Sequence, residues 1–289
     1  MRGRYIPHRG RLLMRTKNNE IKSLINDISI LAHDTFGERC TSAYIMGSLA
    51  RGGFSELASD IDVGIIIGGE PQEDDSSRIE LIHSEAVKNH FKVNNSISIF
   101  WGTIESINGV VEAGRYPPFD RLDLIEHAIL ISGMDVRDQL IKPTKKELEI
   151  ASAKFSVEYL GRQERINEFL NCHLITKKGL VYITKTVLFP ARFLYLEKTG
   201  EIAGNDVSYQ YYIDNFSGDD AELVRNGYQW RLNSLPEDLD LVTRLLNKGL
   251  IKLYHNFIDI YSRQMESYGH HDLKEKLVEW KQNITIHLT

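Results

Sequence analysis

The segment spanning residues 44–63 constrains the fold of this chain more than any other stretch. One apolar run ends at Gly47-Ser48, and a second begins after a short polar linker with Asp60 and Asp62, two residues apart. Side chains of a strand alternate between its two faces, so both acids are expected on one face and the apolar residues between and after them on the other. The pattern predicts two neighbouring strands whose connection carries a Gly-Ser turn.

The residue types in this segment point to metal and phosphate chemistry. Two carboxylates held a few ångströms apart repel each other unless a cation neutralises them, and oxygen ligands of this kind suit Mg²⁺. Asp60 and Asp62 are therefore the candidate catalytic and metal-binding residues. Gly47 can bring backbone N–H groups against an anion, and Ser48 adds a hydroxyl donor, which predicts contact with a phosphate. Gly64 continues the carboxylate face and is expected to leave open space beside the acids.

A structural explanation competes with this interpretation. Taken alone, Asp60 would fit a turn-capping residue and Asp62 a solvated strand edge, because acids in loops are common. A Gly-Ser turn at this spacing favours the metal site, because phosphate binding beside two metal-binding carboxylates suits phosphoryl or nucleotidyl transfer.

Three short groups of residues in this segment resemble the signature of the polymerase-β-type nucleotidyltransferase superfamily: Gly47-Ser48, Arg51-Gly52 and Ser59-Asp60-Ile61-Asp62. Within that superfamily, the chain resembles the aminoglycoside (streptomycin/spectinomycin-type) adenylyltransferases that carry a helical C-terminal domain. The resemblance implies that Gly47, Ser48, Arg51 and Ser59 bind the nucleotide. It also implies Mg²⁺ on the two aspartates, with two ions present when nucleotide is bound.

The resemblance continues in residues 185–207, which contain a Thr-Gly-Glu-Ile turn. In the family, a lysine shortly after this turn reaches the nucleotide phosphates, whereas this chain has Asn205 at the matching position. The substitution removes a charge-assisted contact with phosphate. Tyr228 matches a family tyrosine near the nucleotide and is expected to bind it.

Hydrophobic periodicity predicts an α+β protein. A small mixed β-sheet domain with flanking helices is expected over residues 18–142, followed by an all-α helical bundle over residues 143–289. Thr144 and Glu147 form a capping box that should begin the first helix of the bundle. Residues 1–17 contain six basic residues and no acid, which predicts a disordered extension. A targeting segment and a basic arm for nucleic acid remain alternatives for this stretch.

In the first domain, helices are expected at residues 18–36, 77–92 and 120–128. Strands are expected at residues 42–47, 60–67 and 96–101.

The third carboxylate usual in the superfamily is missing from its expected strand. The matching positions hold Ser96 and Ser98, and serine does not act as a general base at neutral pH without help. Glu105 and Glu112 follow the strand and would substitute only if the chain folds back. The more ordinary explanation of both glutamates is solvent exposure.

Composition restricts the class of partner. The net charge is −5, which argues against a general nucleic-acid binder. No apolar run approaches the length of a membrane span, so a soluble, cytoplasmic protein without a membrane partner is expected. Cys40 and Cys172 have no metal or redox spacing and are expected to be buried thiols.

Two functions are consistent with these observations. The first is Mg²⁺-dependent transfer of a nucleoside monophosphate, AMP from ATP being favoured, to a hydroxyl of a small-molecule acceptor. An antibiotic is one candidate acceptor, because Trp101 together with Glu105, Glu112 and Asp120 would suit a cationic molecule. The second is a catalytically weakened, nucleotide-binding or regulatory protein, similar to antitoxin-type relatives, that keeps the nucleotidyltransferase fold.

Overall fold

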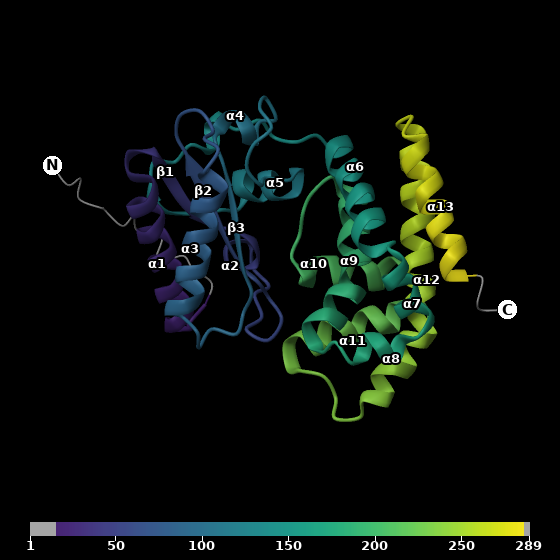
Figure 1. The fold of residues 1–289 in the computed structure, drawn as a ribbon. Helices are drawn as coiled ribbons and strands as arrows, with labels where there is room; N and C mark the ends of the chain where they lie inside the picture. The colour runs from purple at the N-terminus through teal and green to yellow at the C-terminus, as the bar shows by residue number, and fades with distance from the viewer. Residues whose placement is uncertain (1–15, 286–289) are drawn as a thin grey trace. The chain divides into compact units, whose positions relative to one another are not determined.

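The computed structural model describes residues 16–285, and these form two compact units, one ending at Pro143 and the other beginning at Thr144. The first unit is α+β and the second is entirely helical among its described residues, which confirms the predicted fold class (Figure 1). Almost all of the basic stretch 1–17 lies outside the described residues. No helix between residues 16 and 285 combines the length and the apolarity needed to cross a bilayer.

The first unit is built on one mixed sheet of four strands in the order β3-β2-β1-β4. The strands are β1 (Cys40–Ile45), β2 (Ile61–Ile67), β3 (Ile97–Gly102) and β4 (Ile129–Gly133). β1 pairs antiparallel with β2 and with β4, whereas β2 and β3 run parallel. The β1–β2 pair is the predicted couple of strands joined by the Gly-Ser turn.

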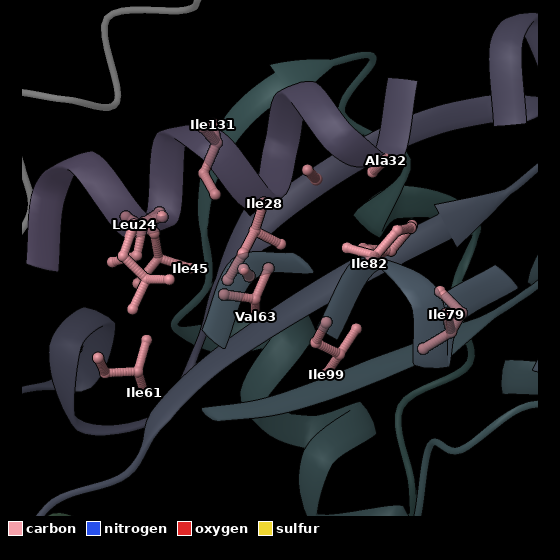
Figure 2. Close-up of a cluster of buried hydrophobic side chains, with 14 of the residues drawn as sticks. Leu24, Ile28, Ala32, Ile45, Ile61, Val63, Ile79, Ile82, Ile99 and Ile131 are labelled. Atoms are coloured by element: carbon pink, nitrogen blue, oxygen red, sulfur yellow. The ribbon is translucent and has the colours of Figure 1, made fainter. Parts of the chain in front are cut away.

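Helices α1 (Asn19–Phe36) and α3 (Asp75–Asn89) pack on one face of this sheet. The Asn18 side chain begins α1 by accepting hydrogen bonds from the N–H groups of Glu20 and Ile21. The alternating apolar row of β2 lies in the core beneath these helices, as the sequence predicts. Figure 2 shows residues of both helices and of all four strands meeting there.

The opposite face of the sheet is also covered. Its core contains Tyr44, Ile66 and Phe100 from the strands, packed against residues such as Leu124 and Val136 from the segment that follows β3. This segment contains α4 (Ile104–Ile107), α5 (Pro118–Glu126) and the 3₁₀ turn η3 (Arg137–Gln139). The remaining short elements of the unit are η2 (Gly37–Arg39) and α2 (Gly47–Arg51).

The first helix of the helical unit begins with the predicted capping box. The Thr144 hydroxyl accepts the N–H of Glu147, whose carboxylate accepts the N–H of Thr144 at 2.8 Å. The elements of this unit are α6 (Lys145–Phe155), the π-helix η4 (Ser156–Leu160), α7 (Gln163–Leu170), α8 (Cys172–Thr176), α9 (Leu180–Thr199), α10 (Asn205–Asn215), α11 (Asp219–Asn233), α12 (Leu239–Ser267) and α13 (His271–Thr285). The long apolar stripe of α12 is buried.

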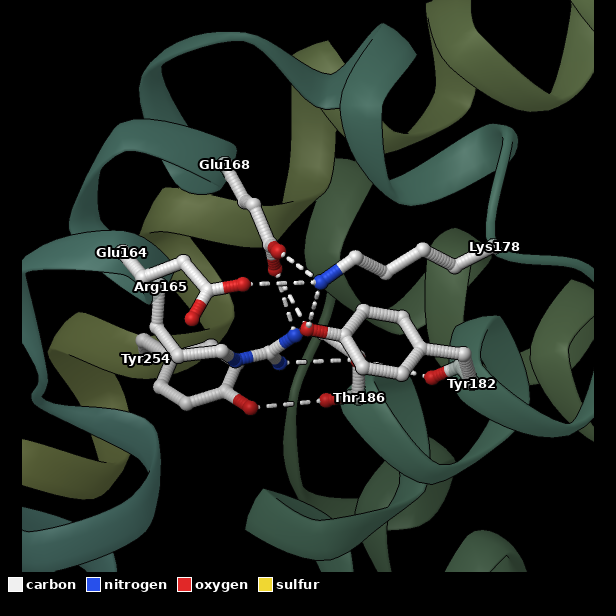
Figure 3. A network of polar contacts seen from close by, with 7 residues as sticks. All are labelled: Glu164, Arg165, Glu168, Lys178, Tyr182, Thr186 and Tyr254. Carbon is white, nitrogen blue, oxygen red and sulfur yellow. Dashed lines mark hydrogen bonds and ion pairs between the residues drawn. The ribbon is translucent and has the colours of Figure 1, made fainter.

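A buried polar network joins α7 to α9 in this unit (Figure 3). The Glu168 carboxylate accepts hydrogen bonds from Arg165 at 2.7 Å, from Tyr182 at 2.6 Å and from Lys178. Arg165 also donates to the hydroxyl of Thr186 at 2.9 Å. Because these contacts pair the buried charges of Arg165 and Glu168, the network serves packing.

Candidate active site

The Gly-Ser turn lies where β1 ends and the short helix α2 begins. Gly47 has a φ of +62°, a backbone conformation that favours glycine. A methyl group added at this residue would overlap the carboxylate of Asp62. The N–H of Met46 donates to the backbone carbonyl of Asp62 at 2.9 Å. The structure therefore brings together the turn and the second of the two predicted acids.

Asp60 directly precedes β2, and Asp62 is its second residue. Both aspartates are half-buried, whereas Ile61 and Val63 on either side of Asp62 are fully buried in the core. The core-facing row thus fixes the direction of the strand and leaves Asp62 on the other face. Carboxylate oxygens on a fixed strand have the chemistry that Mg²⁺ prefers, so these residues fit such an ion.

A third aspartate, which the sequence interpretation missed, lies at the same turn. Asp123 of α5 is buried, and its Oδ2 accepts the N–H of Gly47 at 2.6 Å. Its Oδ1 accepts a hydrogen bond from the guanidinium of Arg51, the last residue of α2. The sequence predicts that both Gly47 and Arg51 bind the nucleotide, whereas in the structure both bind Asp123. Ser48 makes no hydrogen bond through its hydroxyl to any other residue in the range 16–285.

The sequence contains a faint signal for Asp123. It is an acid between two leucines in a short helix, which is a pattern typical of a buried carboxylate with a partner. Its partner could not be found by spacing, because Gly47 is 76 positions away in the chain.

Ser59 has a local structural contact. Its hydroxyl accepts the N–H of Ser55 at 2.9 Å, and its backbone carbonyl accepts the side-chain amide of Asn95 at 2.8 Å. Ser59 is also buried. These contacts hold the linker between α2 and β2, and so they place Asp60 at the start of the strand.

The expected third metal-binding acid has no counterpart on β3. Ser98 is the residue paired with Asp62 across the parallel β2–β3 ladder, and so it shares the face of that aspartate. Glu105 and Glu112 are exposed. Among the described residues, no three acidic, histidine or cysteine side chains gather into a group able to hold a metal. The candidate metal ligands of the protein are therefore Asp60 and Asp62.

The expected open space at Gly64 is not present. A side chain there would overlap the hydroxyl of Tyr116 and the sulfur of Met46, so Gly64 makes room for these two groups. The Tyr116 hydroxyl donates to the Met46 sulfur at 3.5 Å. Burial raises the pKa of Tyr116 well above its usual value, with a smaller contribution from the nearby acid Asp120. Tyr116 therefore stays neutral and closes the sheet face beyond Asp62.

The same loop lines an open hollow of about 620 Å³. Residues 109–117 and Ser106 line it, and Glu112, predicted to attract a cationic acceptor, is among them. Trp101 was predicted to belong to the same acceptor region. Its side chain instead packs against the core under α1 and α3, on the sheet face opposite Asp62.

The remaining predicted nucleotide contact lies in the helical unit. Tyr228 of α11 stacks on Tyr209 of α10, with ring centroids 4.4 Å apart and planes inclined by 12°. Burial raises the pKa of Tyr228 above its usual value. Asn205, which replaces the family lysine, is the first residue of α10.

The described residues thus form a small mixed sheet, with a Gly-Ser turn packed against a strand that carries Asp62, followed by a helical bundle. In a comparison with solved structures, the chain matches spectinomycin adenyltransferase AAD(9) from Enterococcus faecialis, determined with ATP and spectinomycin. The TM-score is 0.58 at 16% sequence identity, over 78% of this chain and 97% of the adenyltransferase. The two proteins therefore share a fold. No family model matches the sequence, and no curated protein matches it either.

Proposed function

We propose that this protein is a Mg²⁺-dependent nucleotidyltransferase that moves a nucleoside monophosphate, AMP from ATP being favoured, to a hydroxyl of a small-molecule acceptor. The observation that carries the proposal is the contact between Gly47 and the carboxylate of Asp62, which unites the two halves of the motif. A fold shared with an adenyltransferase that was solved with ATP and spectinomycin supports the same reaction class.

In the proposed reaction, the acceptor oxygen forms a bond to the α-phosphorus while the bond from that phosphorus to the bridging oxygen breaks. Pyrophosphate leaves, and the acceptor hydroxyl loses its proton to water. Asp60 and Asp62 would hold Mg²⁺, which when bound neutralises charge that develops on the phosphates. Ser48 would donate its hydroxyl to a phosphate oxygen, because that hydroxyl has no partner among residues 16–285. Positioning would supply most of the rate.

The acceptor class is a second part of the proposal. The hollow is lined by residues 109–117, and among them Tyr116 places its hydroxyl beside Gly64, two residues after Asp62 on β2. Glu112 on its wall would favour a cationic molecule, such as an amino-substituted antibiotic. Replacing Glu112 by Gln should raise the KM for a cationic acceptor without changing the KM for the nucleotide. An unchanged KM for the acceptor would remove the hollow from consideration.

The test is pyrophosphate release with each of the four ribonucleoside triphosphates and Mg²⁺, with and without a panel of hydroxylated antibiotics. The proposal predicts release that requires one acceptor and that disappears in Asp60→Asn and Asp62→Asn. Asp34→Asn, an exposed acid on α1, is the control and should keep full activity. Release that persists in both site variants would refute the assignment of the two aspartates.

One observation favours the regulatory alternative, namely Ser98 in the place of an acid opposite Asp62. A protein that had lost turnover in this way would bind Mg²⁺ and nucleotide but release no pyrophosphate. Ser98→Asp restores a carboxylate on the correct face and separates the two functions. Turnover that appears only in this variant would favour the regulatory protein, whereas turnover in the unmodified chain would establish the enzyme.

A further inference from the structure

Asp123 makes contacts that the reaction described above does not use. It is a buried carboxylate on α5, only 4% exposed, and it binds both ends of α2. One oxygen accepts the N–H of Gly47, the first residue of that helix, and the other accepts a hydrogen bond from Arg51, the last residue. A single side chain from a distant segment is thus attached to the beginning and to the end of the turn.

The turn needs such an attachment because α2 is short. A helix of five residues closes very few hydrogen bonds of its own, and tertiary contacts must fix its direction. The one backbone hydrogen bond that ends it runs from Gly52 to the carbonyl of Ser48. A charge-assisted hydrogen bond to the first amide and an ion pair at the last residue together fix both its position and its axis.

Burial makes the attachment rigid. The Arg51 side chain is 14% exposed and the Asp123 side chain 6% exposed, so water competes little for either charge. Removing one partner of such a pair leaves the other charge buried and uncompensated, which is strongly unfavourable. An anion would therefore have to displace a buried ion pair in order to reach Arg51.

We propose that Asp123 is a positioning residue for nucleotidyl transfer: it holds the Gly47–Arg51 turn so that Ser48 faces the phosphates and Gly47 stays against Asp62. The inference rests on the proposed function, and it changes the role of Arg51 from a direct nucleotide contact to a support of the turn. Asp123 itself would not touch the substrate, because both of its oxygens are already engaged.

Asp123→Asn tests the proposal, because it keeps the size of the side chain and removes its charge. The matched control is Asp75→Asn. Asp75 is also fully buried in the first unit, is paired with an arginine, Arg39, at 2.7 Å and accepts a backbone N–H from Gln72 at 2.9 Å. The control lies at the start of α3, away from the turn, and so it reports what loss of a buried ion pair does to stability alone.

Three quantities are measured for each protein: steady-state kinetics, the Kd for Mg²⁺-nucleotide, and hydrogen exchange at the Gly47 amide by NMR. Misplacing a reacting group by about 1 Å lowers rates up to about a hundredfold, so Asp123→Asn should lower kcat/KM by at least about tenfold, mainly through kcat. The Kd should rise about threefold, because one hydroxyl contact is disturbed. The Gly47 amide should exchange faster. Asp75→Asn should keep kcat, Kd and Gly47 exchange near their original values at a temperature where it is folded.

Each remaining outcome has a definite meaning. Unchanged kcat and Kd in Asp123→Asn, or equal losses in Asp75→Asn, would overturn the positioning role while leaving the proposed function intact. If the unmodified chain binds Mg²⁺-nucleotide without turnover, the Kd of Asp123→Asn for Mg²⁺-nucleotide tests the inference. A Kd equal to that of the unmodified chain would then overturn it. An unmodified chain that neither binds nor turns over any nucleotide would refute both proposals, and Asp123 would then hold the turn for packing only.

Discussion

The close approach of Gly47 to Asp62 makes a quantitative prediction about Gly47→Ala. An alanine at a φ of +62° carries left-handed backbone strain of about 1–2 kcal/mol. Its methyl group would also overlap the Asp62 carboxylate, and overpacking of this kind typically adds about 1–3 kcal/mol. The variant should therefore lose about 2–5 kcal/mol in free energy of unfolding, and it should displace a proposed metal ligand.

Gly69→Ala is the matched control. Gly69 also has a positive φ, +77°, but nothing lies within 4 Å of the position that a methyl group would occupy. This control should carry only the backbone strain, about 1–2 kcal/mol. The difference between the two variants isolates the overlap with Asp62.

Urea unfolding measures the stability of both variants, and calorimetric titration measures their affinity for Mg²⁺-nucleotide. We expect Gly47→Ala to unfold at lower urea than Gly69→Ala and to lose at least about tenfold in affinity, the equivalent of about 1.4 kcal/mol. Gly69→Ala should bind as the unmodified chain does. Equal stability of the two variants, together with undiminished binding by Gly47→Ala, would refute the reasoning.

Two further predictions concern charges outside the turn. Glu168→Ala leaves the buried cation of Arg165 without its carboxylate partner and should remove about 3–5 kcal/mol of stability in urea unfolding. Lys178→Ala is the control. Because Lys178 is more than one third exposed, its loss should remove less than about 1 kcal/mol. The hydrogen bonds from Arg137 lower the pKa of Asp135 from 3.8 to about 2, so the stability they contribute is present above pH 3.8 and is lost as the pH falls through 2. Because the Asp135 side chain is 42% exposed, screening keeps this contribution below about 1 kcal/mol. Asp135→Asn should flatten the pH dependence of unfolding between pH 5 and 2, and an unchanged slope would contradict the assignment.

The parts of the fold that the sequence predicts correctly are those set by local periodicity. The strand predicted at 60–67 is Ile61–Ile67, and the helix predicted at 18–36 is Asn19–Phe36. Alternation fixes which face of β2 is buried, because a slip of one residue would expose its whole apolar row. The capping box is equally local, because Thr144 and Glu147 lie three residues apart and bond to each other's backbone N–H groups.

The parts that the sequence does not predict depend on residues brought together from distant positions. An empty face at Gly64 was a reasonable expectation from the strand alone, but the loop carrying Tyr116 returns to cover it. Asp123 reaches the turn from a helix that follows the whole of β3. Neither contact leaves a periodic pattern, because each depends on how a loop crosses the sheet rather than on the residues next to it in the chain.

Asp123 also changes the charge balance of the site, because it adds a carboxylate that is not part of the sequence motif and that pairs with Arg51. Two aspartates contact the turn, Asp62 and Asp123, and Arg51 compensates the charge of Asp123. Asp60 and Asp62, the candidate metal ligands, together carry two carboxylates, which match the charge of one divalent cation. A free arginine at the turn would oppose the binding of that cation, and a free third aspartate would repel the phosphates. Pairing these two residues with each other removes both effects, which is a physical reason for placing a buried ion pair beside a site proposed to bind Mg²⁺ and nucleotide.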